Sequence, residues 1–175
     1  VLTLSKLDES AFENDGATAI NLYAVAQRVA GRLSSFADDQ GVRVRVEGAS
    51  ACIAGSETLA EEMLYNLIEN GIRYNHEGGL VTMKVGSECV EGGLANAAYQ
   101  TVVRVSDTGP GIPAELHDKV FERFFRVDKS RSKETGGTGL GLAIVKHAVM
   151  YHGGVIEVES AEGQGTTFVL RFPSA

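Results

Sequence analysis

The sequence lacks several features that would assign it to common classes of protein. No run of about 18 apolar residues is present, so no segment is expected to span a membrane as a helix. The net charge is −7, and this deficit of basic residues argues against nucleic acid or an anionic membrane surface as the main partner. The two cysteines, Cys52 and Cys89, lie far apart and near no histidine, so they predict no metal site and a reduced, cytosolic setting.

The first residues, VLTLSKLDES, also lack a methionine, a basic end and a long apolar core. We therefore expect no signal peptide, and we expect the chain to be a fragment of a longer protein. What is present is the composition of a folded domain, because 43% of the 175 residues are hydrophobic. Residues 1–16 are interpreted as a lead-in and residues 17–175 as one domain.

Hydrophobic periodicity divides the domain into helices and strands. The helical pattern covers residues 17–39, 56–74, 140–154 and, in a shorter form, 113–121. The strand pattern covers residues 42–48, 51–55, 80–88, 101–106, 155–160 and 166–172. Residues 88–100 are interpreted as a loop insertion, and residues 126–139 as a mobile loop. Because helices and strands do not alternate regularly, the order predicts an α+β domain with a sheet covered by helices in two layers.

The helix predicted over residues 56–74 carries an unusual polar stripe. Ser56 is suited to cap it, and a spacing of three to four residues places Glu62, Asn66, Asn70 and Arg73 on one face, next to the apolar face. An asparagine carbonyl is a neutral oxygen ligand suitable for Mg²⁺ that keeps its waters and phosphates, and Arg73 could meet a phosphate. On this helix alone, a solvated face explains the same residues.

The stretch VSDTGPGIP (105–113) allows two interpretations. Asp-Thr-Gly after a strand begins the catalytic loop of an aspartic protease, but such an enzyme needs two aspartates, and this chain supplies one unless it dimerises. A carboxylate at Asp107 could instead accept a hydrogen bond from a ligand amine, with Gly109 and Gly111 allowing close backbone approach. An ordinary turn also fits the tripeptide.

Two further stretches suit an anion. GGTGLGLA (136–143) leads its glycines into a helix, where free N–H groups bind phosphate, although a flexible hinge would have the same composition. Residues 123–133 hold five basic residues against one acid, a local excess of four positive charges that suits a polyphosphate or a solvated loop. Phe121, Phe124 and Phe125 are expected to anchor this loop to the body.

Taken in order, four stretches resemble the N, G1, F and G2 boxes of bacterial sensor histidine kinases. They are NLIENGIRYN (66–75), DTGPGIP (107–113), FERFFR (121–126) and GGTGLGLAIVK (136–146). The resemblance covers residues 56–172 and includes the terminal GQGTTFVLRFP. It implies the two-layer α/β sandwich of the GHKL (Bergerat) ATPases, with a mixed, mostly antiparallel sheet of about five strands, about three helices and a mobile ATP lid.

The resemblance implies ATP and Mg²⁺ as ligands and assigns roles. Asp107 would accept from the exocyclic amine of adenine, Asn70 would hold Mg²⁺, and Asn66, Arg73 and Arg126 would complete the catalytic set. The further implied ATP contacts are Tyr74, Gly109, Gly111, Ile112, Phe125, Lys133, Gly137, Thr138, Gly139, Leu140, Gly141, Leu142 and Thr167. Three departures are Gly71 in place of the usual alanine, Asn75 in place of threonine or serine, and the longer 88–100 connection.

The phosphoacceptor helix of the family is missing, and His117, despite the acid that follows it, is interpreted as a surface histidine. The implied partners are therefore a dimerisation domain in the parent homodimer and a response regulator. The parent would be anchored in the inner membrane, with this domain in the cytoplasm. An anti-sigma-type serine kinase usually has glutamate where Asn66 stands, which favours the histidine kinase; Glu62 as a base and a non-catalytic nucleotide-sensing module remain open.

Overall fold

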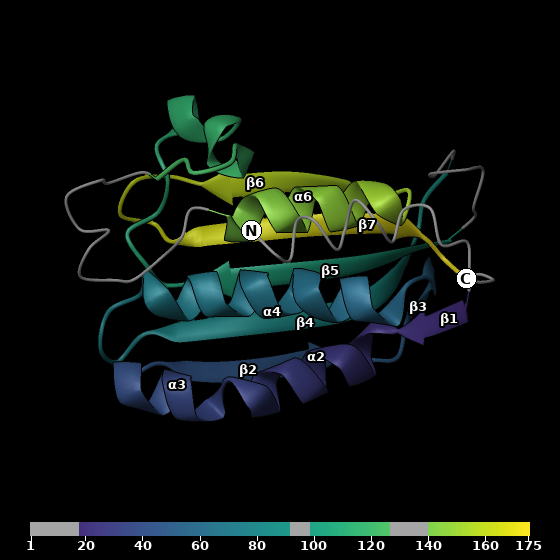
Figure 1. Cartoon of the computed structure of the whole chain (residues 1–175), viewed down its shortest axis with the longest axis horizontal. Helices are drawn as coiled ribbons and strands as arrows, with labels where there is room; N and C mark the ends of the chain where they lie inside the picture. The colour runs from purple at the N-terminus through teal and green to yellow at the C-terminus, as the bar shows by residue number, and fades with distance from the viewer. Residues whose placement is uncertain (1–17, 92–98, 127–139) are drawn as a thin grey trace.

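The computed structural model describes residues 18–91, 99–126 and 140–175. A five-stranded sheet runs through the molecule in the order β2-β4-β5-β7-β6 (Figure 1). Its strands are β2 (Arg43–Gly48), β4 (Leu80–Cys89), β5 (Tyr99–Asp107), β6 (Val155–Ser160) and β7 (Thr166–Pro173). Edge strand β2 pairs with β4 in parallel, and the other three pairings are antiparallel.

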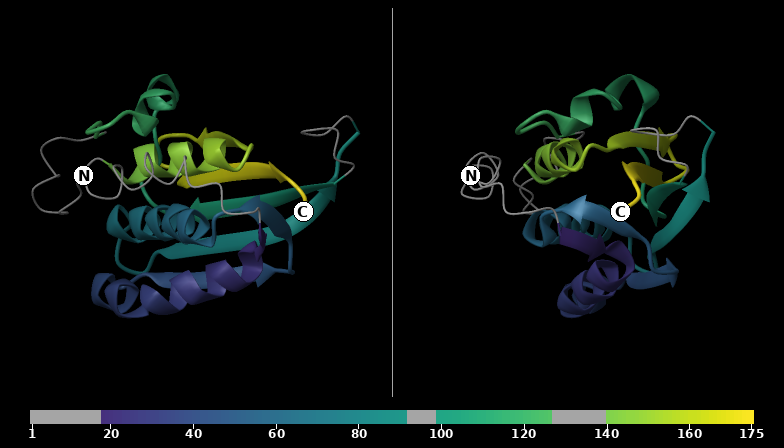
Figure 2. Two further views of the ribbon diagram at one scale, coloured as in Figure 1. Left: turned by 45° about the vertical axis from the view of Figure 1, so that its right-hand side comes forward. Right: turned by 90° about the vertical axis from the view of Figure 1, so that its right-hand side faces the viewer.

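Helices form the second layer on one face of the sheet, as the end-on view in Figure 2 shows. They are α2 (Leu22–Arg32), α3 (Ser34–Gln40), α4 (Glu57–Arg73) and α6 (Gly141–Tyr151). A short antiparallel pair, β1 (Thr18–Asn21) with β3 (Cys52–Gly55), lies beside them. The α+β sandwich expected from the sequence is confirmed. No helix in the described part of the chain has the length and hydropathy needed to cross a bilayer.

Helix α4 lies at the centre of the helical layer and carries part of the site. Ser56 caps it, because its side-chain oxygen accepts from the Leu59 N–H at 3.4 Å, as the sequence predicted. Met63, Leu64, Leu67 and Ile68 are fully or almost fully buried and form one core with the inward residues of the sheet. The helix ends at Arg73, and the chain then turns directly into β4.

Helix α6 packs on α4 with the opposite chain direction. Near its C-terminal end, His152 accepts from the Ser56 N–H at 3.1 Å through Nε2, while Nδ1 lies 2.7 Å from the Ala148 carbonyl oxygen. This pairing assigns the neutral ring, with the proton on Nδ1. Burial is the main cause that lowers the pKa of His152 below its ordinary value.

Two of the predicted helices were wrong in part. The helix predicted over 17–39 begins only at Leu22, because residues 18–21 pair with β3 and Asn21 caps α2 by accepting from the Tyr23 N–H at 3.1 Å. Leu33 then separates α2 from α3. The short helix predicted over 113–121 consists of two single 3₁₀ turns, η2 (Ala114–Leu116) and η3 (Lys119–Phe121).

The predicted loop over 88–100 is shorter than expected, because β4 continues to Cys89 and β5 begins at Tyr99. Residues 92–98 lie outside the described part of the chain. The mobile loop predicted over 126–139 lies outside it as well, apart from Arg126.

Candidate functional site

Asp107 ends strand β5 and faces the helical layer. A Cβ atom added at Gly71 of α4 would lie 3.6 Å from the Asp107 Cβ, so the carboxylate stands against the C-terminal half of α4. Its Oδ1 accepts from the Gly109 N–H at 2.9 Å. Burial is the main cause that raises the pKa of Asp107 above 3.8, opposed by hydrogen bonds from the backbones of Gly109 and Thr166.

The loop after Asp107 needs its glycines. A Cβ at Gly109 would lie 3.0 Å from the Asp107 Oδ1 and 3.1 Å from the Tyr74 carbonyl oxygen. Gly111 has a φ of +77°, and a Cβ there would come within 2.1 Å of the Ala161 carbonyl oxygen. The loop is therefore packed between the end of α4 and the β6–β7 turn, and its backbone lies close to both.

The β6–β7 turn supports the loop from one side. The Ile112 N–H donates to Ser160 Oγ at 2.7 Å, and that hydroxyl donates to the Gly165 carbonyl oxygen at 2.8 Å. Thr166 pairs directly with Asp107 in the β5–β7 register. Thr167 was the residue predicted to touch ATP, but it pairs with Ser106, and their hydroxyls lie 2.9 Å apart. Because neighbouring residues of a strand point to opposite faces, Thr166, not Thr167, lies beside the carboxylate.

The polar stripe of α4 meets the start of α6. A Cβ at Gly141 would lie 3.2 Å from Asn66 Oδ1, so this glycine lets the two helices approach at the asparagine. The Asn66 Nδ2 donates to the Glu62 carbonyl oxygen at 2.7 Å, which turns Oδ1 toward α6. Asn70 follows one turn later and is half-buried. The N-cap residue of α6, Leu140, provides no side-chain cap, and helix N-termini favour anions.

Arg73 is engaged elsewhere. Its guanidinium makes an ion pair with Glu69 at 2.7 Å and lies over the Phe36 ring of α3 at 5.1 Å. Arg73 would therefore have to leave Glu69 and Phe36 to make the predicted contact with a phosphate. Tyr74, expected at the adenine, is the C-cap residue after this helix and is 41% exposed.

The residues of FERFFR do not act as one anchor. Phe121 and Phe125 pack against the core, and the Phe121 ring meets Phe168 edge-on at 6.1 Å between centroids. Phe124 was expected to pack as well, but it is 63% exposed and has a φ of +64°, which is unusual for a residue with a side chain. Arg126 is half-buried and ends the described part of this segment.

The predicted contacts of the lid fall into two groups. Leu140 is buried at the start of α6 in a small apolar cluster with Leu59 and Ile144, and Leu142 packs against the main core. Lys133, Gly137, Thr138 and Gly139 lie outside the described residues.

The donor set constrains any metal. Among the described residues, no group of three or more histidine, cysteine, aspartate or glutamate side chains could hold an ion. Asparagine oxygens on α4 are hard neutral ligands, which suit Mg²⁺ only if a phosphate and water complete its coordination. The residues present thus fit a cation that arrives with a nucleotide.

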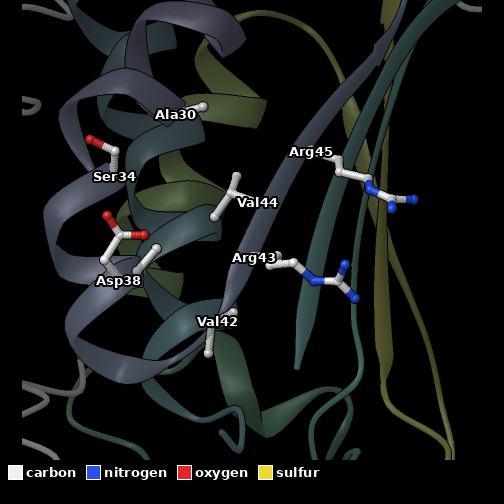
Figure 3. Close-up of a pocket in the computed structure, with 8 residues that line it drawn as sticks. Ala30, Ser34, Asp38, Val42, Arg43, Val44 and Arg45 are labelled. Atoms are coloured by element: carbon white, nitrogen blue, oxygen red, sulfur yellow. The ribbon is translucent and has the colours of Figure 1, made fainter. Parts of the chain in front are cut away.

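A hollow of about 390 Å³ lies apart from these residues, between edge strand β2 and helices α2 and α3. Figure 3 shows Val42 and Val44 pointing toward the helices, and Arg43 and Arg45 pointing to the other side of β2. None of the residues that line this hollow belongs to the predicted site, and strand β4 stands between β2 and the strand that bears Asp107.

The fold and the site define a class of protein. A mixed sheet under antiparallel helices, with a glycine-flanked carboxylate facing an asparagine-bearing helix, is the arrangement of a GHKL-type ATPase domain. Residues 55–175 match the family model described as "Histidine kinase-, DNA gyrase B-, and HSP90-like ATPase", and the chain belongs to this family.

Its relatives narrow the class further. The chain is 37% identical over 158 residues to sensor-like histidine kinase SenX3 of Mycobacterium tuberculosis, covering 90% of this chain and 36% of SenX3. It is 41% identical over 151 residues to sensor protein IrlS of Burkholderia pseudomallei, covering 86% of this chain and 30% of IrlS. The chain thus corresponds to about a third of these relatives' length.

Solved structures agree. The mycobacterial sensor histidine kinase MprB matches with a TM-score of 0.74 and 26% identity, covering 91% of this chain and 98% of that chain. Full-length ShkA in complex with AMPPNP matches with a TM-score of 0.76 and 27% identity, covering 99% of this chain and 34% of that chain. The chain is therefore a catalytic domain of the sensor histidine kinase type, as the four sequence boxes indicated.

Proposed function

We propose that this domain binds Mg-ATP, with adenine at Asp107, and supplies the γ-phosphoryl group to a histidine on a separate dimerisation domain. The observation that carries the proposal is the partly buried Asp107 carboxylate. Burial raises its pKa, so its charge is poorly solvated and would gain from a donor such as the exocyclic amine of adenine. The AMPPNP bound to the related ShkA supports a nucleotide at this kind of domain.

The phosphates would lie between α4 and α6. The N-terminus of α6 would donate N–H groups, and Asn66 and Asn70 would present oxygens from α4. When bound, Mg²⁺ would neutralise phosphate charge, which is the main requirement of phosphoryl transfer beside positioning. The domain's own residues therefore hold and orient the nucleotide.

The acceptor would come from outside the chain. His117 Nε2 lies 2.9 Å from the Ile112 carbonyl oxygen, so this histidine is tied to the loop that supports Asp107. Asn66 cannot act as a base toward a serine hydroxyl, which argues against the serine-kinase alternative. An acceptor histidine in the parent's dimerisation domain, followed by transfer to a response regulator, fits the sensor kinases that the chain resembles.

Calorimetric titration tests nucleotide binding. ADP and a non-hydrolysable ATP analogue should bind the wild type, and Mg²⁺ should tighten binding. Asn70→Ala should lose most of the Mg²⁺-dependent gain while keeping the affinity measured without metal. An equal Mg²⁺ effect in both proteins would contradict the role of Asn70.

Transfer is tested separately, by adding the dimerisation domain of the parent protein and radiolabelled ATP. Acid-labile, base-stable phosphate on that domain is expected. Acid-stable phosphate would indicate a serine kinase, and nucleotide binding without any transfer would indicate a sensing module.

A further inference from the structure

The turn between α4 and β4, residues 74–79, contacts the loop that follows Asp107. Two of its residues reach Thr108, which is the immediate neighbour of the carboxylate. No role for this contact follows from the family boxes, because Asn75 is one of the positions where this chain departs from the usual pattern.

Asn75 joins three parts of the site. Its Oδ1 accepts from the His76 N–H at 2.9 Å and from the Thr108 hydroxyl at 3.2 Å, and its Nδ2 lies 3.3 Å from the Leu80 carbonyl oxygen. A Cβ at Gly79 would come within 2.1 Å of Asn75 Oδ1, so the glycine makes room for this side chain. A single side chain thus links the end of α4, the start of β4 and the Asp107 loop.

Thr108 is held at both ends. Its hydroxyl accepts from the Leu80 N–H at 2.9 Å, and its backbone N–H donates to the Leu80 carbonyl oxygen at 3.1 Å. Its own carbonyl oxygen lies 3.0 Å from His76 Nε2. On the other side of the chain, a Cβ at Gly165 would come within 2.2 Å of the Asp107 carbonyl oxygen. The backbone at residues 107–108 is therefore fixed from two sides.

We propose that Asn75 and His76 are positioning residues that hold Thr108 and so orient the Asp107 carboxylate toward adenine. The inference rests on the proposed nucleotide site. Asn75 gives this chain a longer side chain than the threonine or serine usual in the family, and its amide bonds to two backbone segments as well as to Thr108. Loss of these contacts to Thr108 would let the Asp107 loop shift. The hydrogen bond to the adenine amine would then weaken more than the binding of the phosphates.

Measuring the affinities of the variants for ADP and inosine diphosphate distinguishes a misplaced Asp107 carboxylate from a general loss of protein stability. Inosine diphosphate has the same ribose and phosphates but carries an oxygen in place of the exocyclic amine, so only ADP can make the amine hydrogen bond that a misplaced carboxylate would lose. Asn75→Ala should bind ADP about five- to tenfold more weakly and inosine diphosphate nearly as well as the wild type does. His76→Phe removes the contact to the Thr108 carbonyl oxygen. It should lower the ratio of ADP affinity to inosine diphosphate affinity, as Asn75→Ala does.

Asn21→Ala is the matched control. Asn21 also holds a backbone N–H and a side-chain hydroxyl, those of Tyr23 and Ser50, but at the start of α2. This variant should lower thermal stability and leave both affinities unchanged. An unchanged ratio in Asn75→Ala, whether both affinities hold or both fall equally, would overturn the inference. Failure of the wild type to bind ADP, or to prefer it, would instead refute the proposed adenine site itself, and the inference with it.

Discussion

Replacing Asp107 by asparagine should make the domain more stable and its nucleotide binding weaker. Asparagine has the same shape, and its oxygen still accepts from the Gly109 N–H, so the loop keeps its conformation. The substitution removes a carboxylate whose charged form is disfavoured by burial. It also removes a charge-assisted hydrogen bond to adenine, for which we expect about tenfold to hundredfold weaker ADP binding.

The pH dependence of this stability gain has a definite sign. The pKa of Asp107 is higher in the folded protein than its ordinary value of 3.8, so the folded state binds the proton more tightly than the unfolded state. The wild type therefore loses stability as pH rises from 3.8 through the raised pKa. The advantage of Asp107→Asn should be largest at neutral pH and should shrink as the pH falls through that window.

Urea unfolding at neutral and acidic pH, with calorimetric titration of ADP at neutral pH, measures both effects on the same two proteins. A variant that is less stable at neutral pH would show that the carboxylate supports the apo fold. A variant that binds ADP as well as the wild type would remove Asp107 from the adenine site.

Three further substitutions test the packing beside the site and the titration of His152. Gly71→Ala places a Cβ 3.1 Å from a methyl group of Val81, so it should be better tolerated in a Val81→Ala background; equal changes in unfolding free energy in both backgrounds would contradict this contact. Gly111→Ala, at a φ of +77° and facing a backbone oxygen, should cost about 2 kcal/mol or more of stability in urea unfolding. His152 has a lowered pKa when folded, so the unfolded state takes up its proton first, and stability should fall as pH drops below 6.5 toward the lowered pKa. The His152→Gln variant should lose that part of the slope, and an unchanged slope would mean that His152 does not titrate with folding.

Local patterns predicted most of the fold. The alternation of residues 42–48 and the capped apolar stripe after Ser56 predict β2 and α4, because each depends on neighbours along the chain. The strand over 18–21 was missed because its apolar residues also fit a helical period, and its pairing with residues 52–55 is a tertiary contact.

The sequence also placed the local part of the candidate site. Asp107 and its glycines are adjacent in the sequence, and the structure brings them together around one carboxylate. The structure places Thr166 rather than the predicted Thr167 beside Asp107, and the sequence could not show this because a shift of one residue in strand register reverses the face of the side chain. The placement of Arg73 over Phe36 and the contacts of Asn75 with Thr108 join segments distant in the sequence, so no local pattern could show them.

The central claim is that Asp107 recognises the amine of adenine, and the most direct test is to titrate ADP and inosine diphosphate into the wild type and Asp107→Asn. The carboxylate accepts from the amine but repels the oxygen that replaces it in hypoxanthine, whereas an asparagine amide can donate to that oxygen. We predict that the wild type prefers ADP by about tenfold or more and that the preference disappears in the variant. The same preference in both proteins would contradict the account, because adenine would then be read by another part of the domain.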